Sequence, residues 1–533
     1  MTRAIINLQS IANTTLPRIL TQICRDPDSS EYGSCDRNWW HYKIRDFSSI
    51  ILQQTGYTLF CASKLPEYKK QQHALRELAK ASCIFWNEQA VKFRAFEEYY
   101  PWEEGYPPVA FSTLAVCKLV FENVVSLESV LLGIKKATKQ LMRRFEAKAS
   151  NQQLAGTAAL CWVKRIAPEL VDNNTFETIV SKILDSQAIE GWFPEYGGPD
   201  LGYLSVSIDC LWDAFDATAD SRFKKSAKRA LKFIDVFSDL PSPGLGMHNA
   251  RNTDYIVPYG IARLIEDEES RGVASNVLDK YFGQDELSEH FLTAIDDRYY
   301  SHYYGYSVYR ALRQLNSLEV LVNTNTSVTS ESVLLKESGY FIYHKEASDI
   351  NAIVSCNKGG IITMWFGEIS ASDYGWNVQN KKIKLVSHWW ESFWEMKNIE
   401  NGLEVKGFLT PYKENRSTPL KHALLRVASF LLGYRLINIL KEKLIFKTKA
   451  KKSYSFARRI EWMNDIVTIE DIIQIPSNSE VKRASRLSKR HVASADSYHI
   501  EDIVRVDPRI LIEEKRVEKN DIICIETVYR LKS

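Results

Sequence analysis

The residues best suited to chemistry lie in one loop, residues 190–203, with the sequence EGWFPEYGGPDLGY. Its four glycines and two prolines predict a backbone with special turns. Its three carboxylates can carry protons, and its aromatic side chains offer faces of the kind that stack on sugar rings. The loop is therefore a candidate functional loop. The alternative is a well-packed connector between two buried helices.

A second candidate cluster, residues 247–255, combines an imidazole, a guanidinium and a phenol. His248 can shuttle protons near neutral pH. Arg251 can hold a carboxylate through two hydrogen bonds, and Tyr255 follows on the same loop. These side chains could bind the acid group of a substrate. Equally, they could satisfy the free amides of the next helix.

Aromatic residues are abundant, at 12% of the chain with 13 Trp and 26 Tyr. One aromatic stretch, residues 297–304, reads DRYYSHYY and contains His302. It could line binding subsites for a sugar chain. Packing in a core is the alternative, since most aromatic side chains are buried.

Charge, cysteine content and motifs exclude several classes of protein. The net charge of +3, with both signs interspersed, gives no nucleic-acid footprint and does not oppose an anionic glycan. Nine scattered cysteines without a CxxC pair argue against a disulfide framework or a metal site. No phosphate-binding glycine loop or serine-nucleophile elbow occurs, so we expect no cofactor. We see no signal peptide and no transmembrane run, which favours a cytoplasmic protein.

One basic region stands apart from this even distribution of charge. Lys421, His422 and residues 441–452 make it basic and amphipathic. The pattern predicts a peripheral contact with a membrane face or an anionic partner. A solvated helix is the alternative.

The first part of the chain has the hydrophobic spacing of helices. The predicted helical segments are 71–94, 112–147 (capped by Ser112), 152–166, 174–187, 203–219, 221–237 and 254–266 (capped by Asp254). Glycine- and aromatic-rich loops recur between helix pairs at 99–108, 190–202, 240–253 and 296–304. Helix pairs with their loops gathered at one end predict an α/α toroid, an incomplete helical barrel, over residues 1–320.

The period of the hydrophobic pattern then changes from that of helices to that of strands. Residues 316–333 have the composition of a linker. Alternating runs follow at 340–343, 351–354, 360–365, 382–386, 460–462, 466–473, 503–506 and 522–530. Period-two alternation predicts a C-terminal antiparallel β-sandwich over residues 330–533, with a helical insertion near 419–443. The expected fold class is therefore α+β and multidomain.

Three stretches, together with this architecture, resemble the heparinase II/III-like polysaccharide lyases. Residues 149–153 (ASNQQ) open a small-residue helix and resemble the Asn-His helix start of that family. The run from Glu195 to Tyr203 resembles its loop with a catalytic tyrosine. Residues 456–471 resemble a hairpin of its sandwich. The resemblance covers most of the chain and implies an α/α toroid followed by a β-sandwich.

The resemblance also implies an activity, the cleavage of an acidic, uronate-containing polysaccharide by β-elimination, for example in surface-glycan metabolism. Tyr203 would then be the proton carrier, and Asn151 would neutralise the uronate carboxylate. His248 is the third catalytic candidate. The expected substrate-binding residues are Arg251, Trp192, Glu195, Tyr196, Tyr255 and His302.

The chain also departs from that family. Gln152 and Leu204 stand where the family often has histidines, and no His-Gly-His-Ala-Asp-like run occurs in the sheet region. The nearest runs there are residues 373–376 and 387–390. These departures leave two other functions open: a non-catalytic glycan-binding protein on the same fold, and a toroid glycoside hydrolase using Glu195, Asp200 and Asp209.

Overall fold

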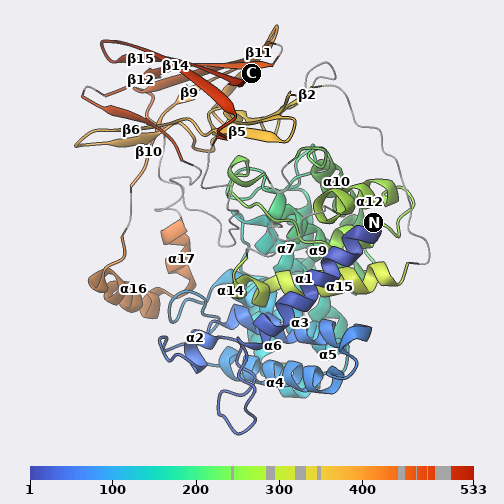
Figure 1. The fold of residues 1–533 in the computed structure, drawn as a ribbon. Helices are drawn as coiled ribbons and strands as arrows, with labels where there is room; N and C mark the ends of the chain where they lie inside the picture. Colours follow the sequence, from blue (N-terminus) through green and yellow to red (C-terminus); the bar gives the residue numbers. More distant parts are fainter. Residues whose placement is uncertain are drawn as a thin grey trace.

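A computed structural model shows a helical layer below a stack of sheets (Figure 1). The N-terminal helices end at Asn316, and the first strand begins at Val333. The structure describes residues 1–241, 245–283, 295–318, 332–344, 350–413, 416–441, 450–463, 465–476, 478–485 and 506–532. The predicted fold class, an α/α toroid followed by an antiparallel β-sandwich, is confirmed.

The helical part is a ring of inner helices surrounded by outer ones. Inner helices such as α7 bury almost every residue, whereas outer helices such as α10 are amphipathic. The described inner helices α3, α5, α7, α9, α11 and α15 contact one another in that order, and α15 contacts α3 again. The helices of this part are α1 (Thr2–Leu20), α2 (Arg37–Trp40), α3 (Thr55–Ser63), α4 (Gln72–Ala90), α5 (Tyr106–Phe121), α6 (Leu127–Arg143), α7 (Ser150–Ile166), α8 (Asn173–Leu184), α9 (Leu201–Thr218), α10 (Ser221–Asp235), α11 (Tyr259–Leu264), α12 (Arg271–Phe282), α14 (Asp297–Tyr299) and α15 (Gly305–Asn316).

Two predicted helix boundaries are wrong. The segment 112–147 is two helices, since α5 already begins at Tyr106 and the chain turns between α5 and α6, where Asn123 has φ of 54°. A left-handed residue ends a helix, and Asn tolerates that conformation. Asp254 is not a helix cap, because the chain from Asn252 to Val257 is non-helical and Pro258 precedes α11.

The described residues of the sandwich form three antiparallel sheets. Their strand orders are β1-β2-β3-β4-β5, β10-β7-β6-β13 and β14-β15-β12-β11-β9-β8. The strands are β1 (Val333–Leu335), β2 (Tyr340–His344), β3 (Ile350–Ser355), β4 (Ile361–Phe366), β5 (Ile369–Asp373), β6 (Trp376–Gln379), β7 (Lys384–Val386), β8 (Glu395–Ile399), β9 (Gly402–Phe408), β10 (Thr410–Pro411), β11 (Ser455–Met463), β12 (Ile466–Gln474), β13 (Glu480–Arg483), β14 (Ile510–Lys519) and β15 (Ile522–Leu531).

The five-stranded sheet belongs to both cores. Alternate residues of a strand point to opposite faces. Tyr340 and Ile342 of β2 and Trp365 of β4 therefore join the core of the toroid. Their neighbours, such as Phe341 and Met364, join the core between the sheets. The toroid is thus packed directly beneath this sheet.

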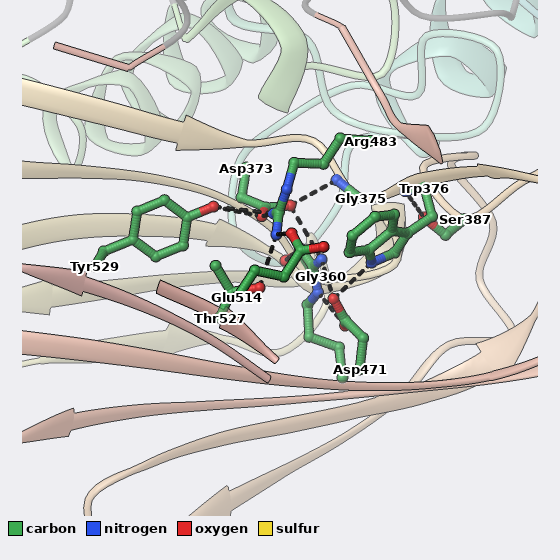
Figure 2. Close-up of polar contacts among 11 residues, drawn as sticks. Gly360, Asp373, Gly375, Trp376, Ser387, Asp471, Arg483, Glu514, Thr527 and Tyr529 are labelled. Atoms are coloured by element: carbon green, nitrogen blue, oxygen red, sulfur yellow. Dashed lines mark hydrogen bonds and ion pairs between the residues drawn. The ribbon is translucent and has the colours of Figure 1, made fainter. Parts of the chain in front are cut away.

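One buried ionic network connects all three sheets. Arg458 on β11 is 0% exposed and donates two 2.7 Å hydrogen bonds to Asp471 on β12. It donates a third, 3.0 Å long, to Asp373 at the end of β5. Arg483 on β13 and the Tyr529 hydroxyl also point at Asp373 (Figure 2). Burial raises the pKa of Asp373, but the two guanidinium groups outweigh burial and hold that pKa below its usual value.

The helical insertion leaves the sheets and lies against the toroid (Figure 1). It comprises α16 (Pro419–Leu432) and α17 (Tyr434–Lys441). The Ser429 hydroxyl donates to the Pro101 carbonyl, 2.6 Å away. Several predicted features lie wholly or partly outside the described residues: most of the 316–333 linker, the end of the insertion and the basic run at 442–449, residues 242–244 and the run at 503–505. The exact domain limits stay predictions.

Arg458→Met should lower the free energy of unfolding by about 3–5 kcal/mol, because it leaves Asp471 buried without its cation and removes one of the two cations at Asp373. Denaturant unfolding followed by circular dichroism measures this difference. Arg459→Met is the matched control. Arg459 lies on the same strand, is exposed and pairs with Glu461, so its loss should cost at most about 1 kcal/mol. Equal effects of the two substitutions would contradict the role given to the network.

Candidate active site

The loops that precede α7, α9 and α11 lie side by side at one end of the toroid. The Ser150 hydroxyl donates to the Pro194 carbonyl at 2.7 Å. The backbone N–H of Ala250 donates to the Pro199 carbonyl at 2.8 Å. The predicted gathering of the 190–202 and 240–253 loops is therefore seen in their described residues. Helix N-termini carry partial positive charge, so this end favours anions.

Asp200 holds the start of α9 and the neighbouring loop together. Its carboxylate accepts hydrogen bonds from the backbone N–H groups of Tyr203, at 3.1 Å, and Arg251, at 3.0 Å. It also accepts one from the Thr253 hydroxyl. Burial raises the pKa of Asp200, while these hydrogen bonds lower it. The three contacts fix Tyr203 relative to Arg251.

Glu195 makes the corresponding contact at α7. Its Oε1 accepts a 2.6 Å hydrogen bond from the backbone N–H of Asn151. Its Oε2 and the Asn151 side-chain Oδ1 are buried and have no hydrogen-bond partner among the described residues. Burial raises the pKa of Glu195 well above its usual value. The site thus contains two buried polar groups with unused hydrogen-bonding capacity.

The turn after Glu195 packs against a tryptophan of the sandwich. Tyr196 and Gly197 have φ of 56° and 103°, and the Glu195 N–H donates to the Gly198 carbonyl at 2.8 Å. A Cβ on Gly198 would lie 2.3 Å from the Trp390 ring. Only glycine therefore fits at position 198 without displacing the ring.

Arg251 and Tyr203 both bind the Asp200 carboxylate through their backbone N–H groups. The Arg251 guanidinium carbon lies 4.0 Å from the centroid of the Tyr196 ring, within cation–π distance. Tyr203 is buried and its ring contacts Tyr255 edge-on, with 6.3 Å between centroids. Burial raises the pKa of Tyr203 well above 10, although Arg251 lowers it. Tyr203 is therefore a neutral phenol.

His248 faces the sandwich. Its Nδ1 lies 2.8 Å from the Ser355 hydroxyl on β3, and its Nε2 lies 2.9 Å from the Thr363 hydroxyl on β4. Burial, with a smaller contribution from Lys358, lowers its pKa to about 3. The Lys358 ammonium donates to the Met247 and Asn249 carbonyls at 2.5 and 2.6 Å. These contacts join the 247–255 loop to the sheet. A catalytic role for His248 stays a prediction.

The other predicted binding residues are largely buried. Trp192 is 6% exposed and belongs to the toroid core. The Tyr255 hydroxyl pairs with that of Tyr303 at 2.8 Å. His302 lies in a π-helical turn, and its Nε2 has no hydrogen-bond partner among the described residues. Burial, followed by Arg298, lowers the pKa of His302 well below its usual value. The binding assignments of these three residues stay predictions.

Sequence reasoning missed Trp390 and Lys358, and it mentioned Asp200 only as a hydrolase carboxylate. Trp390 lies in the run 387–390, noted only for its mismatch with a histidine motif. The signal that could have found Asp200 is its position, one residue before α9 and three before Tyr203, which is typical of an N-cap.

No family model matches this chain, and no curated protein matches it. Solved structures do. The chain is similar to the Streptomyces coelicolor A3 chondroitin AC lyase in complex with chondroitin sulphate, at 8% identity and a TM-score of 0.52. That alignment covers 99% of this chain and 77% of the lyase. A heparinase III structure is also similar, at 10% identity and a TM-score of 0.48, with 99% and 83% of the two chains covered.

The likeness to chondroitin AC lyase concerns the fold. The alignment covers 99% of this chain and therefore includes both its toroid and its sandwich. The protein thus has a polysaccharide-lyase fold.

Across the part of the chain that the structure describes, none of the helices is long and apolar enough to cross a bilayer.

Gly198→Ala should destabilise the protein by about 1–3 kcal/mol, because the added methyl group overlaps the Trp390 ring. Trp390→Ala should also destabilise it by about 3–5 kcal/mol. The double variant should be more stable than the sum of the two losses implies, because the small side chain at 390 makes room for the methyl group. Denaturant unfolding of all four proteins measures this coupling. Strict additivity would contradict the contact.

His248 should make the protein less stable in acid. Its folded pKa of about 3 lies below the ordinary value of 6.5, so the unfolded chain binds a proton first as pH falls. The stabilisation is complete above about pH 6.5 and is lost progressively towards pH 3. Unfolding free energies of wild type and His248→Gln, measured between pH 7.5 and pH 4.5, should show a smaller pH slope in the variant. Parallel slopes would refute this assignment.

Proposed function

We propose that the protein is a polysaccharide lyase that cleaves a uronate-containing glycan by β-elimination. The observation that carries this proposal is the connected cluster of Asn151, Glu195, Asp200, Tyr203 and Arg251 at the helix-start end of a lyase-type toroid. Such a cluster combines groups that can hold a carboxylate with groups that can move a proton.

Binding the uronate carboxylate is the first requirement of the chemistry. The C5 proton beside a carboxylate is weakly acidic, so the negative charge that develops must be stabilised. The Asn151 amide can donate hydrogen bonds, and the N-termini of α7 and α9 contribute partial positive charge. Arg251 supplies a full positive charge next to them. Together these groups would acidify the C5 proton.

Proton transfer is the second requirement. In the proposed step the Glu195 carboxylate takes the C5 proton, the electron pair forms the C4–C5 double bond, and the C4–O bond breaks. The leaving oxygen takes the proton of Tyr203. A raised pKa makes an ionised Glu195 a stronger base than an ordinary carboxylate, and a neutral Tyr203 is ready to donate. Transfer of a proton from Glu195 to the phenolate then restores the site.

The proposed proton transfer does not use His248, whose two ring nitrogens both lie within hydrogen-bond distance of hydroxyls of the sandwich. The same observation favours a second candidate function, a glycan-binding protein without turnover. In that case the site would bind the acidic sugar and Tyr203 would only position it.

Tyr203→Phe should lower turnover by about 10²–10⁴-fold while retaining glycan binding, because it removes only the hydroxyl that carries the proton. The ultraviolet absorbance of the unsaturated uronate product measures turnover on a panel of uronate polysaccharides. A glycan array measures binding. Tyr309→Phe is the matched control, since its hydroxyl donates to the Ala12 carbonyl on the far helix α1, at 3.0 Å.

The outcomes separate the candidate functions. Undiminished turnover by Tyr203→Phe contradicts the mechanism. Binding of uronate glycans without turnover by the wild type favours the binding protein. Cleavage that yields reducing ends without the ultraviolet product identifies a hydrolase.

A further inference from the structure

Helix α16 exposes an unbroken apolar stripe. Leu420, Leu424, Val427 and Leu431 are 70%, 61%, 60% and 65% exposed. Their spacing of four, three and four residues places them in one line along the helix. Soluble proteins rarely leave such a contiguous stripe exposed without an interaction partner.

The opposite face of α16 fixes the stripe in its outward orientation. Ser429, half a turn away from the stripe, is buried and bonds to the Pro101 carbonyl. The Arg426 guanidinium forms two hydrogen bonds with Asp46, 2.6 and 2.9 Å long. Arg94 donates to the Leu431 carbonyl at 3.1 Å. These contacts with the toroid hold the helix in place.

Basic residues accompany the stripe. The helical insertion, residues 416–441, contains five Lys and Arg residues and no Asp or Glu. Of these, Arg416, Lys421, Arg426 and Arg435 are exposed. Two nearby carboxylates, Asp46 and Glu104, are each paired with an arginine. These positive charges therefore attract an anionic surface.

We propose that α16 docks this protein on an anionic lipid surface, with the stripe in the headgroup boundary and the basic residues at the phosphates. An exposed row of four branched aliphatic side chains, accompanied by cations, is the pattern of an interfacial helix. Each Lys or Arg near an anionic bilayer contributes attraction. Docking there would hold the protein close to substrates made or held at a membrane, whichever bond it acts on.

Vesicle co-sedimentation of the full chain tests this proposal. Wild type should bind vesicles of mixed phosphatidylcholine and phosphatidylglycerol, and binding should weaken with salt and on pure phosphatidylcholine. Leu424→Glu with Val427→Glu should reduce the binding constant by at least about tenfold. Lys421→Gln with Arg435→Gln should reduce it by about fivefold for each charge removed.

Val517→Glu is the matched control. Val517 is 54% exposed on the edge strand β14 of the sandwich, so the same change there should leave vesicle binding unaltered. Circular dichroism and thermal unfolding verify that every variant is folded.

Three results would overturn the proposal: no binding of wild type to anionic vesicles, equal binding by the Leu424→Glu and Val427→Glu variant, or a dimer in solution that this variant dissociates while no vesicle binding occurs. The last would identify the stripe as a contact between copies of the chain. None of these results depends on whether the protein is a lyase.

Discussion

The arrangement of the candidate site depends on a single buried carboxylate, that of Asp200. It caps α9 through the Tyr203 N–H and accepts from the Arg251 N–H and the Thr253 hydroxyl on the neighbouring loop. A buried carboxylate is costly unless its lone pairs are satisfied by donors. Here those donors come from two loops, so both loops must adopt their observed conformation for the carboxylate to be stable. The relative position of the Tyr203 and Arg251 backbones follows from this constraint.

The sandwich contributes Trp390, which packs against the turn that follows Glu195. Its buried network at Asp373 and Arg458 fixes the turn into β6, because Asp373 accepts from the Gly375 N–H and Asp471 accepts from the Trp376 indole N–H, at 2.9 and 2.7 Å. Ser387 in turn accepts from the Trp376 backbone N–H at 2.8 Å (Figure 2). Trp390 follows three residues later and packs against Gly198. A continuous series of contacts thus connects the joint between the three sheets with the turn that carries Glu195.

Local hydrophobic periodicity was enough to predict the strands. The alternation at 340–343 and 466–473 became β2 and β12, and the loops around Glu195 and Arg251 do meet. The prediction of one helix over residues 112–147 failed for a local reason. The break between α5 and α6 depends on one residue, the left-handed Asn123, inside a continuous apolar pattern. The contacts of Lys358 and Trp390 could not be predicted, because each joins residues more than a hundred positions apart. Only the packing of the sheet on the toroid brings them together.

The burial that positions these groups also determines their protonation. Desolvation raises the pKa of Glu195 and of Tyr203. The Asn151 N–H at Glu195 and the charge of Arg251 lower these pKa values but do not reverse the shift. An arriving uronate would bring a negative charge beside Arg251, which reduces the help that this cation gives to phenolate formation. Tyr203 would then hold its proton more tightly until the C4–O bond breaks and the leaving oxygen becomes the stronger base. In the proposed mechanism the acid for the elimination therefore comes from Tyr203.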